Sequence, residues 1–253
     1  MNTYRTAEIA GKIGIHPNTV RLYEELKLIP KPKRMSNGYR IFTNLHLEQM
    51  ILVKMALKAE ILHSGLRKQA IEILKEAALL QYDTAIGMTR IYGKNITKEQ
   101  IKSEEAIEIA KKLLSGRRTE METSLFTRKQ AADYLDITID SLRNWEMNGL
   151  LTVKRKQNGY RVYTGEDIRR LKIIRALRSA NYSLSAILRM LNAISHSPDA
   201  DIRLAINTPT GDEDIISVCD KLLTSLQEAK DLAKSMEIQL KKMKQLFYKN
   251  PTL

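Results

Sequence analysis

The stretch SNGYRIFT, residues 36–43, returns in altered form as QNGYRVYT, residues 157–164. Each stretch is typical of two short strands joined by a two-residue turn. The Asn-Gly pairs at 37–38 and 158–159 favour a type I′ turn, because both central residues of that turn need a positive φ. The aromatic and β-branched residues that follow favour an edge strand. We therefore predict a β-hairpin at both places.

The repetition extends on both sides of the hairpins, over about 70 residues in all. Residues 5–29 match residues 127–151 at an offset of 122. The matching pairs include Ala10 with Ala132, Ile15 with Ile137, Arg21 with Arg143, Tyr23 with Trp145 and Glu24 with Glu146. Downstream of both hairpins, apolar residues recur at helical spacing. We therefore expect two copies of one module, at residues 1–75 and 124–197, with a helical connector at 76–123 and a tail at 198–253.

The composition is that of an ordinary globular protein, with 253 residues and 43% hydrophobic residues. The first residues contain no apolar run of signal-peptide length, and no window approaches about 18 uninterrupted apolar residues. We expect no membrane contact and a cytoplasmic, nucleoid-associated protein. The single cysteine, Cys219, cannot form an internal disulfide and fits a reducing compartment.

The net charge of +13 is confined to the two repeats. Residues 1–75 carry 13 Lys and Arg against 6 Asp and Glu, and residues 124–197 carry the same numbers. The rest of the chain is nearly balanced. A basic surface by itself is usually only a solvated one, but localisation to a repeated module indicates a nucleic-acid partner.

Within each repeat a short helix, a tight turn and a second helix precede the hairpin. Thr6 is the expected N-cap of the first helix, Gly14 its expected end, and Pro17 suits the first position of the second helix. Thr138 stands at the corresponding place in the second copy. The order helix, turn, helix, hairpin is that of a winged helix-turn-helix. The fold class that follows is mainly α, with two winged modules, a helical connector and a C-terminal coiled-coil helix.

The strings TVRLYEELKLI and NGYRIFT, and then SLRNWEMNGLL and NGYRVYT, resemble the MerR-type transcription regulators. Leu22 and Asn144 stand where that family has the first tyrosine of a Tyr-Tyr-Glu motif. Lys27 and Gly149 stand at the glycine of its Gly-Leu motif. The resemblance implies contact with double-stranded DNA by Arg21, Tyr23, Tyr39 and Arg40, and by Arg143, Trp145, Tyr160 and Arg161.

The chemistry of these side chains fits the implied roles, because arginine presents a donor fork to phosphate or guanine and a tyrosine hydroxyl can donate to phosphate. For Tyr23 and Trp145 the alternative is a buried aromatic that supports the recognition helix. We expect Glu24 and Glu146 to pair with an arginine of their own module.

The positions best placed to reach base edges differ between the copies. They are Asn18, Thr19 and Leu22 in the first, and Asp140, Ser141 and Asn144 in the second. We therefore predict that the two modules read different DNA, in an operator with two unlike elements per protomer.

The tail carries apolar residues at alternating spacings of four and three. They are Ile215, Cys219, Leu222, Leu226, Ala229, Ala233, Met236, Leu240, Met243 and Phe247. Such a seam needs a partner helix, which predicts a homodimer; packing within the chain's own bundle is the alternative. By resemblance, MerR-type regulators dimerise through a long antiparallel helix. In the connector, Thr97 and Gln100 form a capping box that predicts a helix start.

We expect no cofactor and no metal, because the chain has one cysteine and His16, His46, His63 and His196 lack ligand spacing. An enzyme is disfavoured, since no phosphate-binding glycine loop and no nucleophile with a base is evident. A coiled-coil scaffold leaves the doubled basic module unexplained. The leading hypothesis is a sequence-specific transcription regulator, with RNA polymerase at a promoter as a further partner. The alternative is an architectural factor for recombination or for plasmid or phage partition.

Overall fold

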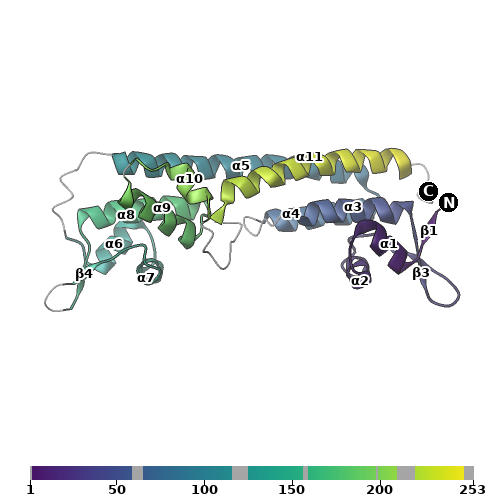
Figure 1. The fold of residues 1–253 in the computed structure, drawn as a ribbon, viewed down its shortest axis with the longest axis horizontal. Coiled ribbons are helices and arrows are strands. Elements are labelled where there is room, and N and C mark those ends of the chain that lie inside the picture. Colours follow the sequence, from purple (N-terminus) through teal and green to yellow (C-terminus); the bar gives the residue numbers. More distant parts are fainter. Residues whose placement is uncertain are drawn as a thin grey trace. The chain divides into compact units, whose positions relative to one another are not determined.

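The computed structural model of the protein describes residues 2–58, 65–115, 125–155, 159–197, 199–209 and 220–247. The chain forms two compact units, Met1–Lys98 with Ser225–Leu253, and Glu99–Thr224. Each unit contains one of the two repeated modules and parts of two long helices, α5 (Tyr82–Ser115) and α11 (Leu222–Phe247) (Figure 1). The mainly α fold class is confirmed.

Module one, as we name the part from β1 to α4, is a helix-turn-helix followed by a hairpin and two further helices. Its elements are β1 (Thr3–Tyr4), α1 (Thr6–Ile13), α2 (Pro17–Glu25), β2 (Lys33–Arg34), β3 (Arg40–Thr43), α3 (Asn44–Lys58) and α4 (Leu66–Ala78). The antiparallel sheet has the order β1-β3-β2. Its core includes Ile9, Val20, Phe42 and Leu52, which are fully buried.

The ends of α1 and α2 are set by local hydrogen bonds. Gly14 ends α1 in the left-handed region, with φ 70°, and Pro17 occupies the first position of α2, both as expected. The expected N-cap was one residue late. Arg5 holds the cap position, because its backbone N–H donates to the Glu8 carboxylate at 2.7 Å, and Thr6 is already helical.

The hairpin of module one does not contain the expected type I′ turn. Gly38 has a positive φ of 83°, whereas Asn37 does not. The Gly38 N–H donates to the Met35 carbonyl at 2.9 Å, and the Met35 N–H donates to the Tyr39 carbonyl at 2.8 Å. This is a three-residue loop in which a type I turn is followed by a left-handed glycine.

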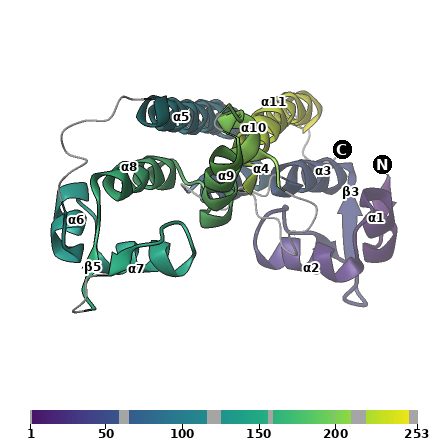
Figure 2. The same cartoon turned by 60° about the vertical axis from the view of Figure 1, so that its left-hand side comes forward.

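Module two, from Phe126 to α10, repeats the same order (Figure 2). Its elements are α6 (Arg128–Leu135), α7 (Ile139–Met147), β4 (Lys154–Arg155), β5 (Arg161–Val162), α8 (Gly165–Ser179), α9 (Leu184–His196) and α10 (Ile202–Asn207). A bridge between Phe126 and Tyr163 replaces the β1–β3 pairing of module one. Asn158, expected in its turn, lies outside the described residues, and Gly159 has φ 81°.

A buried glutamine in module one and a half-buried arginine in module two join elements of their modules at corresponding places. Gln49 on α3 donates to the carbonyls of Leu28 at 2.8 Å and Leu74 at 3.0 Å. In module two, Arg170 on α8 donates to the Leu150 carbonyl at 2.6 Å. The second copy therefore keeps the contact while changing the residue that makes it.

Helix α5 is continuous through the place where the capping box predicted a start. Thr97 lies in its interior, and its hydroxyl donates to the Gly93 carbonyl one turn back at 3.1 Å. The prediction was wrong because residues from Tyr82 onward already form the helix, so that no N-terminal N–H groups remain there to be capped.

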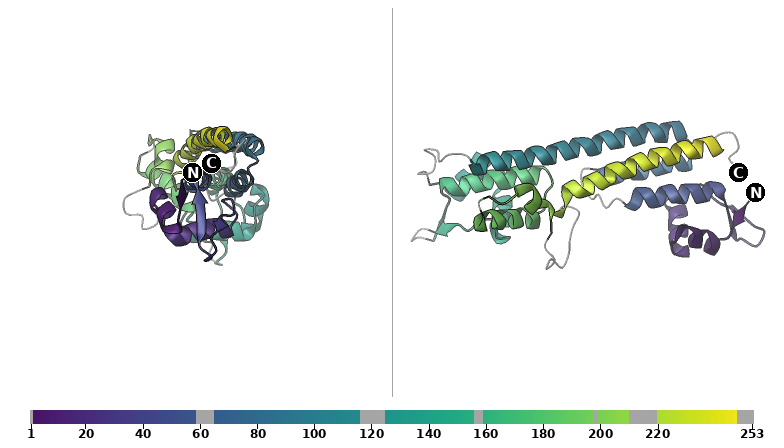
Figure 3. Two further views of the ribbon diagram at one scale, coloured as in Figure 1. Left: turned by 90° about the vertical axis from the view of Figure 1, so that its right-hand side faces the viewer. Right: turned by 45° about the horizontal axis from the view of Figure 1, so that its top comes forward.

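Helix α11 packs on elements of its own chain within the first unit, alongside α3 and the first part of α5 (Figure 3). Gln239 donates to the Glu48 carboxylate at 2.7 Å, and Arg90 pairs with Glu237 at 3.0 Å. The described seam positions, from Leu222 to Phe247, are all buried. Ile215 and Cys219 lie outside the described residues. In this unit the seam of α11 therefore packs within its own chain, which was the alternative expectation. The homodimer stays a prediction.

None of the described helices is both long enough and apolar enough to cross a membrane.

Candidate nucleic-acid interface

The second helix of module one, α2, buries one side and exposes the other. Val20 and Tyr23 are buried, while Asn18, Arg21 and Leu22 are exposed at a spacing of three and four. Thr19, also expected to reach bases, is half-buried. The Arg21 guanidinium donates to the Asn18 side-chain oxygen at 3.4 Å. The exposed face thus offers an amide, a guanidinium and an apolar side chain.

The corresponding helix of module two, α7, exposes different chemistry. Asp140, Arg143 and Asn144 are exposed, and Arg143 lies 3.7 Å from the Asp140 carboxylate. Ser141 is half-buried, and its backbone N–H donates to the Thr138 hydroxyl that caps the helix. The face of α7 therefore combines an acid, a partly neutralised arginine and an amide.

Tyr23 and Trp145 do not belong to either exposed face. Their exposed fractions are 8% and 6%, and burial raises the pKa of the Tyr23 hydroxyl. An aromatic ring enclosed in its own module supports the helix that carries it and has little surface left for DNA. Their burial supports the alternative, in which each ring supports its own helix, and contact of Tyr23 or Trp145 with DNA stays a prediction.

In module one, the hairpin, or wing, is joined to α2 by an ion pair. Arg40 on β3 donates through Nε to the Glu24 carboxylate, and Arg34 on β2 lies 3.9 Å from the same group. Arg34 and Arg40 face each other across the two strands. The carboxylate therefore compensates two like charges that would otherwise repel each other. The expectation that Glu24 pairs with an arginine of its own module is confirmed.

Module two has a stronger version of this contact. Glu146 accepts from Arg161 Nε at 2.8 Å, from Arg128 at 2.8 Å and from the Tyr163 hydroxyl. Burial and the hydrogen bond to Glu146 raise the pKa of Tyr163 to about 12. Phe42 stands at the corresponding place in module one and cannot donate. We call each Glu-centred cluster a wing brace.

The expected wing residues are exposed to solvent to different extents. Tyr39 and Tyr160 are 67% and 74% exposed beside the hairpin turns. The side chains of Arg40 and Arg161 are 23% and 34% exposed, so each guanidinium is held by the brace while part of it faces solvent. A surface cleft in module two lies between Arg128 at the start of α6 and the wing residues Tyr160 and Arg161.

The sequence did not predict that Arg34, Arg128 and Arg155 lie beside the wing arginines. Arg155 faces Arg161 across β4 and β5 as Arg34 faces Arg40. A signal was present, because both copies carry a Lys-Arg pair ahead of the hairpin turn. The pairing register was needed to recognise it, since only strand pairing places the arginine of each Lys-Arg pair opposite a wing arginine.

The described histidines serve local structure. His16 Nδ1 accepts from the Asn18 N–H at 3.2 Å, and His46 Nδ1 accepts from the Thr43 N–H at 3.1 Å. His196 Nδ1 lies 2.8 Å from the Asn192 carbonyl, and His63 lies outside the described residues. Within the part of the chain that the structure describes, no three metal-ligating side chains gather.

Two families match the chain, one on each module. "MerR family regulatory protein" matches residues 5–42, and "MerR HTH family regulatory protein" matches residues 126–194. No solved structure matches.

Similar curated proteins are named as regulators. The mercuric resistance operon regulatory protein of Bacillus cereus is 37% identical over 51 residues, which are 20% of this chain and 39% of that protein. CueR of Yersinia pestis, an HTH-type transcriptional regulator, is 40% identical over 50 residues, 20% of this chain and 36% of its own. YfmP of Bacillus subtilis (strain 168), also an HTH-type transcriptional regulator, is 33% identical over 89 residues, 33% of this chain and 64% of its own. The matched part of this chain thus covers less than two fifths of the length of each of the first two relatives. With one match on each module, the chain carries two MerR-like modules in tandem.

Proposed function

We propose that the protein is a sequence-specific, double-stranded DNA-binding transcription regulator that uses two non-identical modules. One comparison between the two modules carries the proposal. The wing brace is present in both modules, whereas the exposed faces of α2 and α7 carry different side chains. Two modules that bind different DNA sequences need the same supporting contacts but different side chains at the positions that face the bases.

In this proposal α2 and α7 enter the major groove and the wings follow the phosphates. Asn18 can bond adenine through two atoms, Arg21 and Arg143 suit guanine, and Leu22 can contact a thymine methyl group. Asp140 can accept from cytosine. The 13 basic residues of each repeat supply the salt-dependent, sequence-independent part of the affinity.

Selection of binding sites from random DNA by the intact chain tests the proposal. We expect a site with two unlike elements. Arg21→Ala should relax preference in one element and Arg143→Ala in the other, each by about 1–3 kcal/mol against the preferred base. Exposed Glu25→Ala on α2 is the control for a non-specific change of charge. Recovery of one motif repeated twice would refute reading by unlike modules.

Genome-wide mapping of bound sites decides between regulation and architecture. A regulator should occupy promoters, where RNA polymerase is the expected further partner. An architectural factor for recombination or partition should instead occupy recombination sites or one centromere-like cluster. The homodimer predicted from the tail seam is a separate matter of assembly.

A further inference from the structure

Module one is covered by the helix that follows module two. In the first unit, Gln239 and Lys242 on α11 both contact Glu48 on α3, at 2.7 Å from its carboxylate. On the side of α11 that faces α5, Glu237 pairs with Arg90 at 3.0 Å. Between these two rows of polar contacts, Leu240 is fully buried. The apolar seam of α11 is therefore covered by α3 and by the first part of α5.

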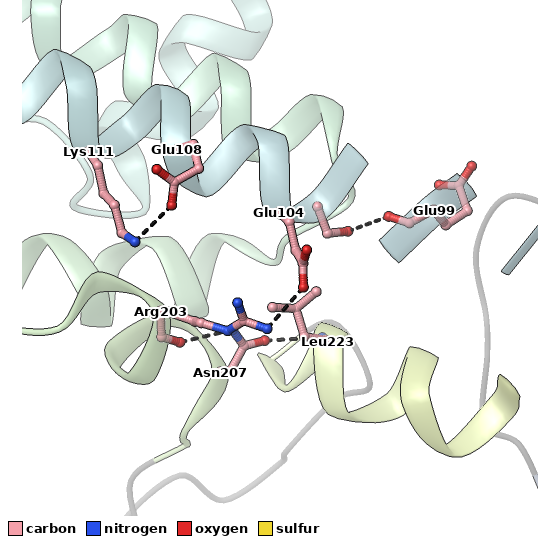
Figure 4. Close-up of polar contacts among 8 residues, drawn as sticks. Glu99, Glu104, Glu108, Lys111, Arg203, Asn207 and Leu223 are labelled. Carbon is pink, nitrogen blue, oxygen red and sulfur yellow. Dashed lines mark hydrogen bonds and ion pairs between the residues drawn. The ribbon is translucent and has the colours of Figure 1, made fainter. Parts of the chain in front are cut away.

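Module two is covered by the helix that follows module one. In the second unit, Ala106, Ile107 and Ala110 on the second part of α5 are buried. Glu104 on α5 pairs with Arg203 on α10 at 2.9 Å (Figure 4). Asn207, at the end of α10, accepts from the backbone N–H of Leu223 at 3.1 Å.

Each compact unit thus combines one module with the long helix that follows the other module. In a symmetric dimer, each chain would place its long helix on the module of the other chain. Here both modules and both long helices belong to one chain. We propose that a single chain is the complete DNA-binding assembly: it is monomeric in solution, and one copy occupies one operator with two elements.

The physical reason lies in the seam itself. A homodimer through α11 requires the buried positions of the seam to face a second copy, and in the first unit they are already covered. A second copy would also have to displace the contacts of Glu48 with Gln239 and Lys242. Because the two halves are covalently joined, closure within the chain occurs at a high effective concentration that a second chain must exceed.

The mass of the unmodified protein is the first test, and it needs no DNA. Sedimentation equilibrium in the micromolar range should give the chain mass of 29.0 kDa. Twice that mass would overturn the proposal. Failure of this test leaves the proposed regulator function intact. Conversely, a monomer that binds no specific DNA sequence would refute the proposed regulator function but leave the proposed monomeric state intact.

The second test asks whether the contacts form within one chain or between two exchanged chains. Isotopically heavy and light protein are unfolded, mixed, refolded and joined with a zero-length carbodiimide, which can link Lys242 to Glu48. We expect linked peptides that are entirely light or entirely heavy. Mixed peptides would show exchange between chains and overturn the proposal. The Lys111 and Glu108 pair, within one helix, is the control that must never be mixed.

A matched pair of variants on α11 gives a third test. Leu240 is fully buried, while Ile238 is 69% exposed on the same helix. Leu240→Asp should lower the unfolding midpoint of the first unit at unchanged mass, and Ile238→Asp should leave both unchanged. If Leu240→Asp instead converted a dimer into folded monomers, the seam would join two copies and the proposal would be wrong.

With DNA, titration of a labelled operator at concentrations well above Kd should saturate at one chain per duplex. Two chains per duplex, with four elements in the selected site, would contradict the proposal.

Discussion

Two glutamates, Glu24 and Glu146, determine how the wing arginines can act. Each holds an arginine Nε, and part of each guanidinium side chain faces solvent. We therefore propose two roles for the wing arginines, positioning the wing on α2 or α7 and neutralising the DNA backbone. These roles can be separated, because lysine keeps the charge but lacks the planar fork.

We expect Arg40→Ala and Arg161→Ala to weaken binding to all DNA sequences about equally. Each lost phosphate contact should reduce the slope of log K against log salt concentration by about 0.9. Arg40→Lys and Arg161→Lys should restore that slope and only part of the affinity, because the brace is not remade. Binding titrations at several salt concentrations measure both quantities. A changed sequence preference with an unchanged slope would assign these residues to base reading instead.

His46 should make module one sensitive to acid. Burial lowers its pKa to about 4, and its Nδ1 accepts the N–H of Thr43, the residue just before α3. Since the unfolded chain binds a proton near pH 6.5, stability is full above that pH and falls as the pH drops toward 4. The loss should approach about 3 kcal/mol for the whole shift, measured by denaturant titration of the first unit.

Module two provides the control for this prediction. Asp167 stands at the position of His46 and accepts the Thr164 N–H at 2.8 Å. His46→Asp should therefore keep the cap and move the acid transition of the first unit to lower pH. The same acid midpoint in both proteins would show that another group controls it.

At the scale of elements, the turns that follow α2 and α7 have the same backbone conformation but different residues. Lys27 and Gly149 occupy corresponding positions with φ 58° and 76°. A side chain in the left-handed region is strained, and Lys27 is exposed, so that little packing is lost when it is removed.

Lys27→Gly should stabilise the first unit by about 0.5–1 kcal/mol, and Gly149→Ala should destabilise the second by about 1 kcal/mol. At Gly149 no atom lies within 4 Å of the added Cβ, so that backbone strain alone decides the effect. Chemical denaturation of each variant provides the check. A destabilising Lys27→Gly would mean that the lysine makes a compensating contact.

The elements were predictable from the sequence where local signals decide. The apolar periodicity, Gly14 and Pro17 located the helix-turn-helix, and the repeat located its second copy. The turn type was not predictable, because the pairing register decided between a two-residue and a three-residue loop. The burial of Tyr23 and Trp145 could not be decided from the sequence, since an aromatic beside arginine fits both surface and core. The apolar seam of α11 could be predicted from the sequence, whereas the helices that cover it could not.

For the whole molecule, the exchanged helices predict that neither module is an independent domain. Deleting residues 225–253 removes most of α11 and exposes the surface that it covers on module one. We expect hydrogen exchange to accelerate throughout α1 to α3, with α6 to α9 much less affected. DNA selected by the truncated chain should keep only the element read by α7. Unchanged protection of module one would show that α11 is dispensable there.

The two exposed faces, on α2 and α7, have an evolutionary consequence. In a protein assembled from identical subunits, every mutation in the gene changes both halves of the recognition surface together, so that a regulator and its palindrome must drift in step. Here a codon change at Asn144 leaves Leu22 untouched. If α2 and α7 read DNA as proposed, natural selection can retune one half of the binding site while the other anchors the protein, and new target genes can be acquired one half-site at a time.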